Sequence, residues 1–265
     1  MKETITLLDG VSWQKEALLQ KMEDDTFYYG HCAKNMFSSS KVKLLAKSPK
    51  SYYYVDKYRG SEQPLRDGWL FHAAILEPHV FDAQIFCDTL TKGVKFKELE
   101  AYHGKGNVYT KKEKQDAERL ARAFTVNSNA MARLYKCKTE VANCGVIMDI
   151  PFRGKADVVT KDGGIIDLKT CQNITNFRKD AYTMGYDIQT YIYTELWDIP
   201  YDKFEFIAID KKSLDIGIYR CSEEFYQSGK NKVEAVLKAY KESIQGKDPD
   251  EVTEFINNYY FQDVL

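Results

Sequence analysis

The sequence predicts an α/β core that follows a helical N-terminal region. Apolar residues recur with helical spacing through most of the first 125 residues. From Lys138 onward the pattern changes to the alternation of apolar and polar residues that is typical of strands. After residue 170, helical and strand patterns follow one another, as in a sheet that is covered by helices.

The N-terminal region is expected to hold three main helices. They are Ser40–Lys47, Leu65–Leu76 and Lys111–Leu134. Pro49 and Pro78 end the first two, because a proline disfavours helical backbone at the residue before it. The second helix is apolar on most sides and should be buried. The core positions expected on the third are Leu120, Phe124, Met131 and Leu134.

The second half of the chain is expected to alternate between strands and helices. Four strands come first: Thr139–Val141, Gly145–Phe152, Lys155–Thr160 and Ile165–Thr170. A turn at Lys161–Gly164 joins the last two. The elements expected after them are a helix at Phe177–Trp197, a hairpin of Phe204–Asp210 and Asp215–Cys221, and a final helix that Ser222 caps and that runs to about Ile244.

Composition narrows the possible classes of function. The net charge of −1 argues against a coat-like nucleic-acid binder, although 38 Lys and Arg residues are enough for a local basic groove. The six cysteines include no C-x-x-C pair, which argues against a zinc site or an iron–sulfur cluster. No apolar run approaches the roughly 20 residues of a membrane helix, and the N-terminus has no apolar signal segment. We therefore expect a cytoplasmic protein with reduced thiols and no membrane partner.

Two aspartates flank the predicted turn near Asp162. Asp157 and Asp167 should lie opposite each other on adjacent strands, where Cβ atoms are about 5 Å apart. Facing carboxylates repel unless a positive charge compensates them. Oxygen ligands at this spacing suit Mg²⁺ or Mn²⁺.

Lys169 should point to the same side of its strand as Asp167, because strand side chains alternate. It would then lie beside the metal and a scissile phosphate, where it orients water or neutralises developing charge. The carbonyl of Leu168 lies between them and is a further candidate ligand. For the tripeptide alone, a salt bridge on a surface strand is the alternative interpretation.

Two further groups of residues are ambiguous when taken alone. Tyr186, Gln189 and Tyr193 share one helix face and would suit contacts to DNA, or equally a packing face rich in tyrosine. His72 lies within an apolar helix, where a lone histidine is either a core residue or a metal ligand.

Several segments, in this order, resemble motifs of a known nuclease family. Gly154–Asp157, Ile166–Thr170 and Gln189–Tyr193 are similar to the Asp, Asp-x-Lys and Gln-x-x-x-Tyr motifs of RecB-type nucleases in the PD-(D/E)XK superfamily. Gly68–Pro78 resembles the Gly-x-x-x-His-x-x-x-Leu-x-Pro helix of RecE-type phage exonucleases (exodeoxyribonuclease VIII-like), and Ser40–Pro49 resembles the segment that opens their nuclease domain. The similarity extends from about residue 38 to 220.

The resemblance implies a PD-(D/E)XK restriction-endonuclease-like core and a two-metal exonuclease. Such an enzyme degrades linear double-stranded DNA from 5′ ends and leaves single-stranded 3′ tails for recombination. Members act as ring-shaped oligomers, often beside a single-strand annealing protein, so a phage-type enzyme in a bacterial host is expected. The iron–sulfur branch of the family is excluded, because closely spaced cysteines are absent from the sequence.

The resemblance also assigns roles to individual residues. The implied metal ligands are His72, Asp157, Asp167 and the Leu168 carbonyl, for two ions of Mg²⁺ or Mn²⁺. The implied catalytic lysine is Lys169, and Gln189 and Tyr193 hold the edge of the site and the DNA. Glu140 occupies the position of an acidic residue on the preceding strand. The implied DNA contacts are Ser40, Arg153 and Lys155, of which the last two would bind phosphates.

These inferences give a division of the chain and three functional alternatives. Residues 1–37 form an N-terminal segment of unknown role, and residues 38–265 form one nuclease domain. Within it, residues 38–135 are mainly helical and residues 136–265 hold the catalytic core and a C-terminal helix. A processive exonuclease is the first interpretation. A structure-selective or restriction-like endonuclease and a catalytically silent DNA-binding module are the alternatives.

Overall fold

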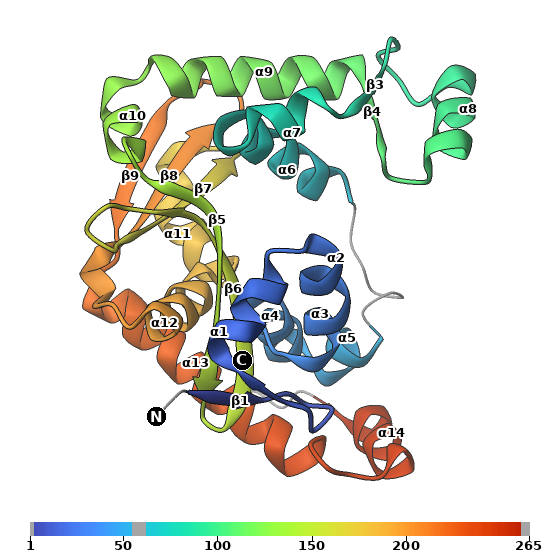
Figure 1. Ribbon diagram of the computed structural model, residues 1–265, viewed down its shortest axis with the longest axis vertical. Helices are drawn as coiled ribbons and strands as arrows, with labels where there is room; N and C mark the ends of the chain where they lie inside the picture. The colour runs from blue at the N-terminus through green and yellow to red at the C-terminus, as the bar shows by residue number, and fades with distance from the viewer. Residues whose placement is uncertain (1–2, 55–61, 261–265) are drawn as a thin grey trace.

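The computed structural model describes residues 3–54 and 62–260, and a five-stranded mixed sheet lies at its centre (Figure 1). The strands follow the order β5 (Lys138–Ile147), β6 (Ile150–Val159), β7 (Ile165–Cys171), β8 (Phe204–Asp210) and β9 (Ile216–Arg220). Neighbouring strands are antiparallel except β7 and β8, which run parallel. The predicted α/β class and the β8–β9 hairpin are confirmed.

The parallel β7–β8 pair requires a crossover, which two helices supply. They are α11 (Phe177–Thr183) and α12 (Tyr186–Trp197). The prediction of one continuous helix over this range was wrong, because Gly185 between them adopts left-handed backbone with φ of 65°. A Cβ atom there would also press on the Lys43 side chain at 3.2 Å, so glycine suits both the backbone and the packing.

The first hairpin of the sheet also differs from the prediction. The expected strand Gly145–Phe152 is in fact the end of β5, a two-residue turn and the start of β6. Met148 and Asp149 form this turn with positive φ angles of 49° and 59°. Hairpin turns of this kind usually contain Asn or Gly, so the sequence carried no recognisable signal.

Helices cover both faces of the sheet (Figure 1). On one face, α12 and α13 (Glu223–Ser243) pack with α4 (Ser39–Lys47) in the largest apolar cluster. On the other face, α6 (Gln63–Leu76), α9 (Lys111–Val126) and α10 (Ser128–Leu134) pack over β7 and β8. Ser222 caps α13 as predicted, through its hydroxyl oxygen and the Phe225 N–H.

The predicted helix Lys111–Leu134 is divided at Asn127. This residue caps α10 by accepting a hydrogen bond from the Ala130 N–H at 3.0 Å. Leu120 and Phe124 are buried as expected, and Leu134 is partly buried. Met131 was wrongly predicted to be in the core, because the division at Asn127 turns it outward and leaves it 36% exposed.

Residues before α4 form a layer against β5 and β6. The layer consists of the hairpin β1 (Thr4–Thr6) and β2 (Ser12–Gln14), followed by α1 (Lys15–Met22), α2 (Asp25–Phe27), η1 (Tyr28–Cys32) and α3 (Ala33–Asn35). Its apolar cluster includes Cys144 of β5. Phe37 then pairs with the sheet, since the Arg153 N–H donates to the Phe37 carbonyl at 2.9 Å.

The remaining elements lie at the periphery. Ser48 ends α4 and caps α5 (Pro49–Tyr53). After α6 come α7 (Pro78–Asp82) and an arm in which β3 (Ile85–Cys87) pairs with β4 (Val108–Thr110) and carries α8 (Val94–His103), which projects from the body (Figure 1). Two short helices, η2 (Ile174–Asn176) and η3 (Tyr201–Lys203), precede α11 and β8, and α14 (Pro249–Asn258) follows α13. No helix in the described ranges is long and apolar enough to cross a membrane.

Candidate active site

The candidate site begins where the backbone pairing between β6 and β7 ends. Val158 pairs with Ile166 and Val159 with Ile165, so Asp157 and Asp167 occupy the next position of the predicted register, just past the last pair. Beyond these pairs the strands separate, and the Asp157 Oδ2 atom accepts a hydrogen bond from the Leu168 N–H at 2.7 Å. This bond fixes the Asp157 carboxylate at the opening between the strands.

Glu140 faces Asp157 from the other side. On β5, Thr139 pairs with Val158 and Val141 with Ala156, so Glu140 lies opposite Asp157. Its backbone is left-handed, with φ of 51°, which is uncommon for a residue other than glycine. Strained backbone of this kind is often found at functional sites. Here the strained residue is Glu140 itself, and its carboxylate points into the site.

His72 of α6 completes a group of three possible metal ligands. Its Nδ1 atom lies 3.4 Å from Asp157 Oδ2. One donor atom from each of His72, Glu140 and Asp157 lies within 4.8 Å of the other two. An imidazole with two carboxylates is a donor set for a divalent cation such as Mn²⁺ or Mg²⁺.

Asp167 is held by a second set of contacts. Its carboxylate is 2% exposed, forms a close ion pair with the Lys169 ammonium and accepts a hydrogen bond from Gln189 Nε2 at 2.6 Å. The Lys169 ammonium also lies 3.4 Å from Gln189 Oε1. Asp167, Lys169 and Gln189 therefore form a connected polar unit beside the three possible ligands.

The charges in this group perturb one another. Burial raises the pKa of Glu140 to about 7, and the Asp157 charge adds to the effect. Burial opposes the charged form of His72 and of Asp157, but their mutual attraction raises the pKa of His72 and lowers that of Asp157. Burial likewise opposes the Lys169 charge, yet Asp167 and Asp157 raise its pKa, so it stays an ammonium. A buried carboxyl such as Glu140 with a raised pKa indicates negative charge that a cation would stabilise.

These residues line a cleft of about 960 Å³. Its walls come from α2, η1, α4, α6, α7, the strands β5–β7, α11 and the start of α12. Basic and acidic groups share it: Lys43, Lys155, Lys169, Lys211, Asp25, Glu77, Glu140, Asp157 and Asp180. Large apolar and aromatic groups also line it: Tyr29, Leu65, Trp69, Val80, Phe177, Met184 and Tyr186. The cleft thus offers cationic groups, carboxylates and apolar surface side by side.

The remaining predicted residues lie in different surroundings. Gln189 and Tyr193 are both buried on α12, and the Tyr193 hydroxyl donates to the Lys155 carbonyl at 3.0 Å. Tyr193 thereby supports the β6 backbone near Asp157. Lys155 lines the cleft and pairs with Asp25 at 2.6 Å.

Two predicted DNA contacts are not at the cleft. Arg153 is 9% exposed, and its guanidinium stacks on the Tyr28 ring at 4.1 Å, so it packs the N-terminal layer onto β6. Ser40 is exposed in the first turn of α4 and does not line the cleft. Any contact of Ser40 with DNA would lie outside the cleft.

Lys43 is a cleft residue that the sequence did not reveal, and it lies beside Tyr186, which the sequence had offered as a possible DNA contact. The ammonium groups of Lys43 and Lys169 lie 5.2 and 4.8 Å from the Tyr186 ring centroid. Burial, with repulsion from Lys169, lowers the pKa of Lys43 to about 8. The only available signal was the position of Lys43, one helical turn after Ser40.

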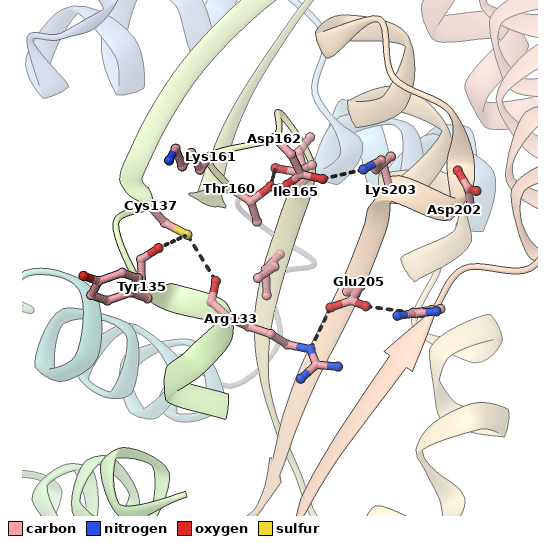
Figure 2. Close-up of a pocket in the computed structure, with 13 residues that line it drawn as sticks. Arg133, Tyr135, Cys137, Thr160, Lys161, Asp162, Ile165, Asp202, Lys203 and Glu205 are labelled. Carbon is pink, nitrogen blue, oxygen red and sulfur yellow. Dashed lines mark hydrogen bonds and ion pairs between the residues drawn. The ribbon is translucent and has the colours of Figure 1, made fainter. Parts of the chain in front are cut away.

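A second pocket of about 540 Å³ lies at the opposite end of β7 and β8 (Figure 2). Most of its charges are paired: Glu205 bridges Arg133 and Arg220, and Asp162 contacts Lys203 and Thr160. Figure 2 shows these pairs spanning the pocket wall. The residues that line this second pocket include no histidine and no group of unpaired acids. The cleft at His72 is therefore the better candidate for the active site.

Comparison with known proteins establishes the family. A family model described as "PDDEXK-like domain of unknown function (DUF3799)" matches residues 38–257. The chain belongs to this family. The superfamily inferred from the sequence motifs is thereby confirmed for this DUF3799 chain. No curated protein matches it in sequence.

One solved structure has a fold similar to that of the DUF3799 chain. A "putative exonuclease" from Eubacterium rectale aligns over 91% of this chain and 95% of its own, with a TM-score of 0.61 and 18% identity. Two others align less well. SSO0001 has a TM-score of 0.35 and 13% identity, over 83% of this chain and 85% of its own. A phage-related exonuclease from Haemophilus somnus 129PT has a TM-score of 0.30 and 18% identity, over 59% of this chain and 89% of its own. The first comparison supports a nuclease-like fold.

Proposed function

We propose that the protein is a metal-dependent deoxyribonuclease that degrades linear double-stranded DNA from its ends. The observation that carries this proposal is the meeting of two groups in one cleft. His72, Glu140 and Asp157 offer a site for a cation, and the Asp167–Lys169 pair lies beside them on the adjacent strand. Cleavage of a phosphodiester needs both parts, a means of activating water and positive charge for the phosphate.

His72, Glu140 and Asp157 fit a divalent cation, Mg²⁺ or Mn²⁺. Asp167 and the Leu168 carbonyl are the candidate ligands for a second ion, in accord with the motif resemblance. Bound divalent cations would polarise the phosphodiester and lower the pKa of a coordinated water. The high pKa of Glu140 supports this assignment, because a cation would stabilise the ionised carboxylate.

The chain's own residues would bind and orient the phosphate. Lys169 is held as an ammonium by Asp167, so it can neutralise charge that develops on the scissile phosphate. Gln189 fixes the Asp167 carboxylate, which keeps the Lys169 ammonium in place. Tyr193 holds the β6 backbone at Lys155, two residues before Asp157.

The finer properties rest on the motif resemblance. We include in the proposal digestion from the 5′ end to leave 3′ tails, a role in recombination, a ring-shaped oligomer and a single-strand annealing partner. The family match gives the nuclease-like domain, and the name of the Eubacterium rectale protein accords with exonuclease activity. The preferred metal, Mg²⁺ or Mn²⁺, belongs to the same proposal.

The test uses a linear 5′-phosphorylated duplex and a closed circle of the same sequence, each with Mg²⁺ or Mn²⁺. The wild type should release nucleotides from the 5′ ends of the linear DNA, leave single-stranded 3′ tails and leave the circle intact. Asp167→Ala and Lys169→Ala should lose at least about 1,000-fold in rate. Lys203→Ala, in the second pocket, is the matched control and should retain full activity.

Other outcomes separate the alternatives. Cutting of the circle would replace the exonuclease with a structure-selective or restriction-like endonuclease on the same site. DNA binding without cleavage in either metal would leave a catalytically silent DNA-binding module. Full activity of Asp167→Ala would show that the active site lies elsewhere.

A further inference from the structure

Trp69 is an aromatic residue at the cleft that the proposed chemistry does not use. It lines the cleft from α6 and is 42% exposed, a large fraction for an indole. Leu65, one turn earlier, also lines the cleft and is 67% exposed. Exposed apolar groups beside a charged site call for an explanation, because each would be stabilised by a partner with apolar surface.

The Trp69 ring is fixed in place by its neighbours. It stacks on Tyr109 of β4 with ring centroids 5.8 Å apart and an angle of 5° between the planes. The Arg66 guanidinium lies 4.2 Å from the Tyr109 ring centroid. Arg66 in turn pairs with Glu113 at 2.9 Å and donates to the Gly106 carbonyl. The indole is therefore a rigid surface, and ordering it on binding costs little entropy.

Spacing along α6 places this surface next to the candidate metal ligand. Trp69 is three residues before His72 and Leu65 is seven before it, so all three lie on the same helix face. A helix rises 1.5 Å per residue, which puts Trp69 about 5 Å and Leu65 about 10 Å from His72 along the axis.

We propose that Trp69 stacks on an unpaired base next to the scissile phosphate, so that the cleft takes a single strand at an unpaired DNA end. This inference rests on the proposed nuclease function and names the form of substrate that its site takes. Within a duplex, stacking covers both faces of every base except the outer face of the terminal pair, whereas an unpaired base can turn its face toward an aromatic ring beside the scissile phosphate. Lys43, Lys155 and Lys169 line the same cleft and provide positive charge for the strand's phosphates.

The cleft therefore combines the two features of single-strand recognition, an aromatic platform and basic groups along the backbone path. It follows that a duplex must open by a few base pairs before its strand reaches the site. Ends with unpaired terminal nucleotides should be cleaved faster than fully paired ends.

The test combines abasic substitution in the DNA with substitution of Trp69. Single-stranded and frayed-end substrates carry one abasic nucleotide at successive positions near the cleavage point. In the wild type, one position should lower kcat/KM by about 10-fold when its base is missing. In Trp69→Ala the rate with intact DNA should fall by a similar factor, and the abasic substitution should have no further effect. Trp69→Phe should recover most of the loss.

Equal abasic effects in wild type and Trp69→Ala, or no sensitive position in the wild type, would overturn the proposal. Thermal unfolding of Trp69→Ala checks that the fold is intact. If Trp69→Ala unfolds, Trp69→Phe and Trp69→Leu provide the same comparison, since only the phenyl ring can stack.

A binding experiment keeps this inference separate from the nuclease proposal. The Asp167→Ala protein is titrated with an oligothymidine in Mg²⁺, and tryptophan fluorescence is recorded. Stacking should quench the Trp69 contribution, so that quenching is lost in Trp69→Phe and kept in Trp197→Phe. Quenching without cleavage by the wild type would refute the nuclease and leave the stacking site. Cleavage without quenching would leave the nuclease and refute the stacking site.

Discussion

At the scale of single residues, ion pairs and hydrogen bonds hold each charged group of the site in place. Asp167 is nearly inaccessible, so its carboxylate depends on Lys169 and Gln189 for polar contacts. A buried carboxylate without such partners would be costly. Because Asp167 is buried, its ion pair with Lys169 must keep one geometry. This geometry gives the Lys169 ammonium a fixed position in the cleft.

Gln189→Ala should lower kcat by about 10- to 100-fold, as is common when the partner of a ligating group is lost. The reason is that Asp167 Oδ1 would lose its amide donor, which raises the pKa of Asp167 further and weakens it as a ligand. Initial rates across a Mg²⁺ titration measure the effect. Gln227→Ala, exposed on α13, is the control. Unchanged rates for Gln189→Ala would contradict the proposed role.

Glu140→Gln should stabilise the metal-free protein in a pH-dependent way. The folded protein favours protonated Glu140, so stability is highest below the ordinary pKa of 4.5 and falls as pH rises toward about 7. Discounted for its partial exposure, the gain should be about 2 kcal/mol at pH 8 and near zero at pH 4.5. Thermal unfolding in a chelator at both pH values measures it, with Glu98→Gln on α8 as control. An equal gain at both pH values would rule out this explanation.

A bound divalent cation should reverse the stability advantage of Glu140→Gln over the wild type. Mg²⁺ or Mn²⁺ stabilises the protein only as far as it binds the folded state. The melting temperature of the wild type should therefore rise more than that of Glu140→Gln when metal is added. A larger rise in the variant would remove Glu140 from the ligand set.

At the scale of elements, close contact between α12 and α13 sets the position of Gln189 and Tyr193. The helices meet at Gly229, where a Cβ atom would lie only 2.0 Å from the Asp187 carbonyl oxygen. The buried Asp187 carboxylate reinforces the contact through Ser228 at 2.7 Å and Lys232 at 2.5 Å. Backbone on both sides leaves no flexible atom to move aside.

Gly229→Ala should destabilise the protein by about 3 kcal/mol, the upper part of the usual range for overpacking. Activity should fall as well, because any shift of α12 carries Gln189 away from Asp167. Urea unfolding gives the stability and the linear-duplex assay gives the activity. Gly68→Ala is the control for stability, since a Cβ there meets nothing within 4 Å and alanine favours the helix. Wild-type stability of Gly229→Ala would refute this account of the packing.

At the scale of the whole molecule, the N-terminal layer completes the covering of β5 and β6. Its buried side chains include Ile5, Leu18, Met22 and Met36, which pack with Cys144. Arg153 and Lys155 also make their contacts to this layer, with Tyr28 and Asp25. We propose that the role of residues 3–37 is to cover this edge of the sheet and to support the cleft at Lys155.

Expression of residues 38–265 alone tests this role. Loss of several buried side chains, each worth about 1.5–3 kcal/mol, should remove at least about 5 kcal/mol of stability. That equals much of the net stability of an ordinary domain, so the shortened chain should unfold at a much lower temperature or aggregate. Circular dichroism during heating measures this. An unchanged melting temperature would show that residues 38–265 fold independently.

The sequence by itself determined the α/β class, the family and the alignment of Asp157 with Asp167. Alternation along strands and a turn at Lys161–Gly164 are local properties, so the register could be calculated from residue numbers. The same holds for the cap at Ser222. Local patterns did not reveal the helix divisions at Asn127 and Gly185 or the turn at Met148–Asp149. At these positions the sequence allows either a continuous or an interrupted element, and packing decides between them.

Only the tertiary structure decided which residues meet. His72 lies 85 residues before Asp157, and no local pattern brings α6 over the end of β6. Arg153 and Lys155 share one strand face, yet the N-terminal layer buries the first and leaves the second at the cleft. Trp69 belongs to an apolar helix that was expected to be buried; Leu70, Phe71 and Leu76 are buried, but the fold leaves Trp69 exposed. Contacts between segments distant in sequence depend on how whole elements pack, which local periodicity does not encode.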